Sequence, residues 1–186
     1  MNLKPHYPLA VGDVPRAHLR VVYDYIEANI ERVPLSLELP KIRKYFCEAN
    51  PPCLDEKYFN VAVHVRRPNP HDDRVDGTDT PDEYYLRLIN KIRAEHEGVK
   101  PLRFYLVSQG KLADFKNYLH ADTILMIDTP ALGAFRTLVE ADVLIISRSS
   151  FSYIAGHLNE NLVYYQPFWH PPLPHWRVPS PNDRKN

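Results

Sequence analysis

Apolar residues in this chain follow two periods, which alternate along the sequence from Asn60 onward. One period is a short continuous apolar run that stops abruptly at polar residues, as strands buried on both faces of a sheet do. Five runs of this kind predict strands: Val61–Val65, Leu102–Val107, Thr123–Ile127, Val143–Ile146 and Leu162–Tyr165.

The other period is helical, with apolar residues three or four positions apart. A helix with Tyr85, Leu88, Ile89 and Ile92 on one face is predicted after the first strand, and its start is marked by Thr80, Pro81 and Glu83. Further helices are predicted around Leu112, Phe115 and Leu119, over Ala131–Glu140 with Leu132, Phe135 and Val139 inward, and over Phe151–Leu158.

Strands that alternate with amphipathic helices require right-handed crossovers, so the five strands should be parallel, with helices on both faces of the sheet. The predicted fold class is therefore α/β, a Rossmann-like doubly wound sheet. In the common strand order 3-2-1-4-5, ligands bind beyond the carboxyl ends of the first and fourth strands, where the strand order reverses.

The regions outside the alternating pattern are rich in proline. Residues 1–59 are predicted to be a helical segment packed on the body, with one helix from Pro15 to Glu31 and a short one from Lys41 to Glu48. Residues 60–170 form the predicted Rossmann-like core. Residues 171–186 form a proline-rich irregular tail, and the aromatic residues from Pro167 onward suit a strap over the body. We expect one domain overall.

The charge balance and the cysteine content of the chain argue against several classes of partner. The 186 residues carry 23 basic and 23 acidic side chains, so no global field would recruit nucleic acid or an anionic membrane. The only cysteines, Cys47 and Cys53, are too few for a disulfide scaffold or a zinc site and are interpreted as reduced thiols. With neither an apolar leader nor a membrane-length apolar stretch, the expected location is cytoplasmic.

The candidate site lies at the ends of the first and fourth predicted strands. The first strand ends in Arg66 and Arg67, and the fourth ends in a hydroxyl-rich segment that leads into a helix: Ser147, Arg148, Ser149, Ser150, Phe151 and Ser152. Guanidinium groups pair with phosphate bidentately, and a helix N-terminus offers free N–H donors, so the two segments together predict a diphosphate site. Taken separately, the arginines would also suit a solvated strand edge, and the serines would suit helix caps.

Other residues at the strand ends have two interpretations each. His64 should point to the sheet face opposite Val63 and Val65, as a ligand contact or as a buried histidine with satisfied hydrogen bonds. Asp128 ends the third strand and would bind a ribose or a base, or cap the next helix. No glycine-rich dinucleotide signature or P-loop follows the first strand, which argues against a nicotinamide or flavin dehydrogenase.

A cluster of aspartates follows the first strand and raises the question of a metal. Asp72, Asp73, Asp76 and Asp79 supply oxygen ligands of the kind that magnesium prefers. A solvated acidic loop is the preferred interpretation, and no metal site is predicted.

Two motifs together resemble the donor-binding, C-terminal half of GT-B enzymes, the α1,2/α1,6-type fucosyltransferases with a His-x-Arg-Arg motif. The first motif reads His64-Val65-Arg66-Arg67 at a strand end, and the second is the apolar strand from Ala141 that runs into the hydroxyl-rich turn ending at Ser152. The resemblance covers roughly Asn60 to Trp169. The family often has an aspartate that reads guanine where this chain has Ala134.

The resemblance implies roles for the residues of both motifs. Arg66 would bind the donor's β-phosphate and stabilise the leaving diphosphate as the catalytic residue. Arg67 would assist it, His64 would lie near the nucleotide, and Ser149 and Ser150 would contact phosphate. Such enzymes work without a metal, because arginine supplies the positive charge, and no cofactor is expected beyond the nucleotide-sugar donor.

Two functions follow as hypotheses. The first is an inverting, fucosyltransferase-like glycosyltransferase that moves a sugar, most simply from GDP-fucose, to a glycan or other hydroxyl acceptor. The second is a non-catalytic nucleotide-sugar-binding domain, or a degenerate partner subunit, for which a second chain would supply the acceptor site.

Overall fold

The computed structural model describes residues 39–67, 79–96, 100–168 and 170–179. All of them belong to one compact unit, Glu38–Asn186. The helix predicted from Pro15 to Glu31 lies outside the described residues.

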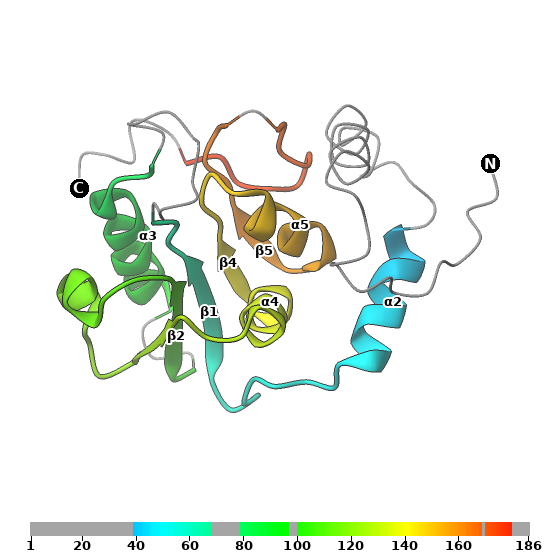
Figure 1. Ribbon diagram of the computed structural model, residues 1–186, viewed down its shortest axis with the longest axis horizontal. Coiled ribbons are helices and arrows are strands. Elements are labelled where there is room, and N and C mark those ends of the chain that lie inside the picture. Colours follow the sequence, from blue (N-terminus) through cyan, green and yellow to red (C-terminus); the bar gives the residue numbers. More distant parts are fainter. Residues whose placement is uncertain (1–38, 68–78, 97–99, 169, 180–186) are drawn as a thin grey trace, which may run out of the picture. The chain divides into compact units, whose positions relative to one another are not determined.

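The five predicted strands form one all-parallel sheet in the order β3-β2-β1-β4-β5 (Figure 1). The strands are β1 (Phe59–His64), β2 (Leu102–Ser108), β3 (Thr123–Ile127), β4 (Val143–Ile145) and β5 (Leu162–Tyr164). Strand order reverses between β1 and β4, where Val61 pairs with Val143 and Val63 with Ile145. The doubly wound topology and its switch point are therefore as predicted.

Helices cover both faces of the sheet (Figure 1). The helix α3 (Asp82–Glu95) and the 3-10 helix η3 (Leu112–Tyr118) share a core with the side chains of Val61, Val63 and Val65. The helices α4 (Ala131–Glu140) and α5 (Ser150–Leu158) lie on the opposite face, toward which His64 points. Alternation along β1 thus sends its valines into one core and its histidine toward the other helix layer.

The segment before β3 differs from its prediction. It is a 3-10 helix with non-helical backbone angles at Phe115, and Leu112 and Leu119 are both 64% exposed. Phe115 and Tyr118 are the buried residues of this segment, because residues three apart lie above one another in a 3-10 helix. A helix is therefore present where the sequence predicts one, but it is a 3-10 helix that ends at Tyr118.

The inward face of α4 also differs from the prediction. Leu132 is 58% exposed, whereas Ala134 and Leu138, one turn apart, are buried. Val139 is buried as predicted, and Phe135 is half-buried. Ala134 lines the cavity at the strand ends, and Leu132 faces away from the core.

Two outer segments complete the unit. Helix α2 (Leu39–Ala49) has no buried residue and is held by Arg43, whose guanidinium donates to the carbonyls of His157 and Leu158 at the end of α5. The described part of the tail packs against β5 and α5. Arg177 exchanges backbone hydrogen bonds with β5 and its neighbour, and Trp176 packs on Gly156.

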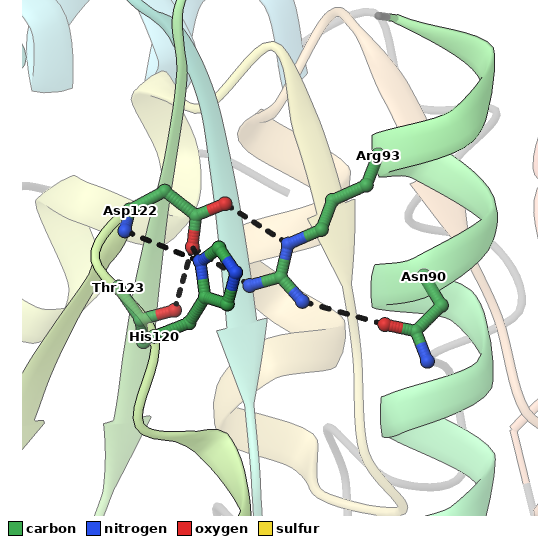
Figure 2. A network of polar contacts seen from close by, with 5 residues as sticks. All are labelled: Asn90, Arg93, His120, Asp122 and Thr123. Atoms are coloured by element: carbon green, nitrogen blue, oxygen red, sulfur yellow. Dashed lines mark hydrogen bonds and ion pairs between the residues drawn. The ribbon is translucent and has the colours of Figure 1, made fainter.

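The end of the sheet opposite the carboxyl strand ends is fastened by an ion pair (Figure 2). Arg93 of α3 donates two hydrogen bonds, of 2.7 and 2.9 Å, to the carboxylate of Asp122, which also contacts His120 and Thr123. Although burial opposes it, the hydrogen bond and charge of Arg93 hold the pKa of Asp122 below its ordinary value. This network ties the end of α3 to the start of β3.

None of the described helices combines the length and the apolar character needed to cross a bilayer. Cys47 and Cys53 are both exposed and form no disulfide.

Candidate functional site

A cavity of about 240 Å³ lies at the switch point, beyond the carboxyl ends of β1 and β2. Its wall comes from the end of β1, the end of β2, the start of α4 and the turn into α5. The lining residues are His64, Val65, Arg66, Arg67, Val107, Ser108, Gln109, Thr129, Ala131, Ala134, Ser149 and Phe151. Five of the seven predicted site residues therefore meet in one cavity: His64, Arg66, Arg67, Ser149 and Phe151.

The two arginines that follow β1 lie in different surroundings. Arg67 donates a hydrogen bond of 2.6 Å to Asp82, which also accepts one of 2.8 Å from the hydroxyl of Tyr118. Its guanidinium lies over the ring of Phe115, 5.2 Å from the ring centre. Arg67 therefore holds α3 and η3 to the end of β1, while Arg66 also lines the cavity.

His64 is buried at the base of the cavity, where it is 8% exposed. Its Nδ1 shares a hydrogen bond of 2.8 Å with the hydroxyl of Ser147, a residue that is fully buried at the end of β4. Burial, reinforced by the positive charge of Arg66, lowers the pKa of His64 to about 3. The imidazole is therefore neutral at pH 7, and it can hydrogen-bond a ligand without adding charge.

The N-terminus of α5 forms the side of the cavity next to β4. Ser149 is the N-cap residue and lines the cavity, and Ser150 is the first helical residue. The side chain of Ser149 accepts no capping hydrogen bond from the first-turn N–H groups. Phe151 lines the cavity with its ring 5.6 Å from that of His64.

The N-terminus of α4 borders the same cavity through Ala131 and Ala134. Each helix start carries a partial positive charge, because its first N–H groups lack intrahelical partners. With Arg66 added, two helix starts and a guanidinium border one cavity, and none of the described residues that line it carries a carboxylate. Such surroundings favour an anionic ligand.

Two of the predicted site residues do not line the cavity. Ser150 lies one residue beyond Ser149 in the first turn of α5. Asp128 is exposed, and its carboxylate accepts a hydrogen bond of 3.4 Å from the N–H of Gly110. The alternative that Asp128 caps α4 is wrong, because the N-cap residue is Pro130 and no side chain caps the helix.

Several cavity residues were not predicted as site residues. Ser108 ends β2, Gln109 follows it, and Thr129 precedes α4. Ser147, which bonds His64, does not itself line the cavity. The polar residues that follow apolar runs were visible in the sequence. However, only the strand order shows that the ends of β2 and β3 border the same cavity as the end of β1.

The described residues hold no group of three or more acidic, histidine or cysteine side chains placed to bind a metal ion. Of the acidic loop, Asp72, Asp73 and Asp76 lie outside the described residues, and only Asp79 lies within them.

Among known proteins, similarity to this chain is found at the level of solved structures. No family model matches the sequence, and no curated protein matches it. A crystal structure of POFUT1 with GDP shares 15% identity, covering 68% of this chain and 45% of that one, with a TM-score of 0.37. A crystal structure of POFUT1 with GDP-fucose shares 16% identity, covering 68% and 43%, with a TM-score of 0.35. This chain therefore spans less than half the length of the POFUT1 chains that it matches.

Proposed function

We propose that this domain binds a nucleoside diphosphate, as part of a nucleotide sugar, in the cavity at the switch point. The observation that carries the proposal is the convergence of Arg66 with the N-termini of α4 and α5 around one cavity, with no carboxylate among the described residues that line it. A diphosphate is the ligand group that matches a planar guanidinium and free backbone N–H donors at once.

The proposed reaction is inverting glycosyl transfer of the fucosyltransferase type, with GDP-fucose as the first donor to test. An acceptor hydroxyl attacks the anomeric carbon and gives its proton to water or to a base bound with the acceptor. The bond from that carbon to the β-phosphate oxygen breaks, and its electron pair stays on the diphosphate. Arg66 and the N–H groups of the α5 start would stabilise that growing negative charge. Neutral His64 would hold the donor by a hydrogen bond, and no metal is required in this scheme.

A second candidate function is a nucleotide-sugar-binding domain without activity of its own. It is favoured by the lack of a base in the described cavity wall, where His64 has a pKa of about 3 and shares its Nδ1 with Ser147. Such a histidine is too weak a base at pH 7 to take the acceptor's proton. In either case the acceptor, a glycan or other hydroxyl compound, would be bound by groups outside this cavity, in this chain or in a second one.

The test is a thermal-shift panel with GDP, UDP, ADP and their sugars. A ligand at 100 times its dissociation constant adds about 2.7 kcal/mol of apparent stability, which is readily measured for a domain of this size. Stabilisation by at least one nucleoside diphosphate supports the proposal, and its absence at millimolar ligand contradicts it. Release of free sugar or its transfer to an added acceptor would then separate the enzyme from the binding domain.

A further inference from the structure

Two polar side chains of the cavity wall have no hydrogen-bond partner in the described structure. The Thr129 hydroxyl is buried, yet no described group donates to it or accepts from it. The Gln109 amide is exposed at the same cavity and is likewise without a partner among the described residues. Buried hydroxyls in native proteins nearly always have partners, because their desolvation is otherwise uncompensated.

The two turns that present these side chains each contain a residue with positive φ, and hydrogen bonds join one turn to the other. Asp128 has a φ of 53°, and Gly110 has a φ of 117°, so a left-handed residue lies beside each of them. The N–H of Asp128 donates to the carbonyl of Ser108 at 3.0 Å, and the Asp128 carboxylate accepts from the N–H of Gly110. The turn after β2 and the turn after β3 therefore hold each other in place.

The Thr129 hydroxyl is not used by the fold in the way that a threonine before a helix often is. Helix α4 begins at Ala131, its N-cap residue is Pro130, and no side chain caps it. The Ser108 hydroxyl beside it is already used, since it donates to the carbonyl of Val65 at 2.6 Å. Thr129 and Gln109 are thus the neutral hydrogen-bonding groups left for a ligand on this side of the cavity.

We propose that Thr129 and Gln109 form a subsite for the uncharged polar part of a nucleotide, the edge of its base or its ribose. The inference rests on the proposed function, which places the diphosphate at Arg66 and the start of α5. The ligand then runs across the end of β1, with its diphosphate toward β4 and its base and ribose toward β2 and β3. A hydroxyl and an amide each donate and accept, so they match groups that do both and add nothing to the attraction of charge.

Calorimetric titration of the Thr129→Val variant tests this division, because valine keeps the shape of threonine and removes its hydroxyl. The probes are GDP, UDP, ADP and inorganic pyrophosphate. We expect affinity for at least one nucleoside diphosphate to fall about three- to tenfold, the effect of one neutral hydrogen bond, with pyrophosphate affinity within about twofold of the parent's. Thr129→Ser, which keeps the hydroxyl, should restore most of the loss. An equal loss for all three bases assigns the ribose, and a loss confined to one assigns that base.

The Gln109→Leu variant makes the same comparison at an exposed position, where it spares the core if Thr129→Val does not fold. Nucleoside diphosphate affinities that stay at the parent's values in both variants, or that fall in step with pyrophosphate affinity, overturn the subsite and leave the proposed function standing. The subsite is also overturned if the parent protein binds pyrophosphate and binds no nucleoside diphosphate more tightly than it binds pyrophosphate. A parent that binds none of the four probes contradicts the proposed function itself.

Discussion

Replacing Arg66 with alanine should weaken ligand binding while leaving folding nearly unchanged. Arg66 is half-buried and lines the cavity beyond β1. A charge-assisted hydrogen bond contributes roughly 1.5 to 3 kcal/mol, so affinity for a nucleoside diphosphate should fall about tenfold or more. Arg66→Lys should recover only part of it, since an ammonium cannot reproduce the planar fork of guanidinium.

Replacing Arg67 should reduce the stability of the fold more than it reduces ligand affinity. Its ion pair with Asp82 is partly exposed, with both side chains 23% exposed, so solvent screening limits its contribution to about 1 kcal/mol. Arg67→Ala should therefore lower the free energy of unfolding by about that amount and reduce affinity less than Arg66→Ala does. The ion pair with Asp82 is the reason for the smaller effect on binding that we expect at Arg67.

The assay is calorimetric titration of both variants with GDP and pyrophosphate, together with urea unfolding of each. Lys44→Ala on α2 is the matched control, because this lysine is 71% exposed and its loss changes net charge by the same amount. Parent-like affinity in Arg66→Ala, or a larger loss of affinity in Arg67→Ala, would refute the phosphate role of Arg66. Unfolding of Arg66→Ala would show instead that this arginine is structural.

Three further predictions concern pH, packing and metal. Burial lowers the pKa of His64 to about 3 and that of His157 to about 4, and the charges of Arg66 and of His170 respectively add to it. Below pH 6.5 the unfolded chain therefore binds more protons than the folded one, and each histidine should lower the free energy of unfolding by about 2 kcal/mol between pH 7 and pH 5. Urea unfolding at the two pH values measures this. A His157→Leu variant whose free energy of unfolding falls as much as the parent's over this pH range would contradict the prediction. A β-carbon on Gly156 would lie 2.9 Å from the buried ring of Trp176, so Gly156→Ala should cost about 1 to 3 kcal/mol in thermal unfolding without changing affinity, and a parent-like melting temperature would count against this packing. Nucleotide binding, where present, should survive EDTA because arginine supplies the charge, whereas a loss restored by magnesium would implicate the acidic loop.

The sheet could be predicted from the sequence because its strands are parallel and buried. Such strands appear as uninterrupted apolar runs, and five runs separated by amphipathic helices leave few topologies open. The face of α3 was also predictable, since Tyr85, Leu88, Ile89 and Ile92 are all buried. By contrast, Leu132 is exposed although it shares the apolar period of α4, because the inward face of a helix is set by tertiary packing as well as by its local pattern.

The cavity was predictable in part for the same reason. Arg66, His64 and the turn at Ser149 end neighbouring strands, and strand order alone brings them together. The hydrogen bond between Arg67 and Asp82, fifteen residues apart, could not be predicted from the position of Arg67 at a strand end. Nor could the unpartnered hydroxyl of Thr129, because burial and partners are properties of the folded turn.

The most direct test of a diphosphate site at the switch point is a two-dimensional NMR titration of the labelled protein with pyrophosphate and then GDP. Both ligands should shift the backbone amides of Arg66, Ser150 and Phe151, because the phosphates would lie against those N–H groups. GDP alone should also shift Gln109 and Thr129. Absence of shifts at Arg66 and the start of α5, or shifts confined to the opposite end of the sheet near Arg93, would contradict the site.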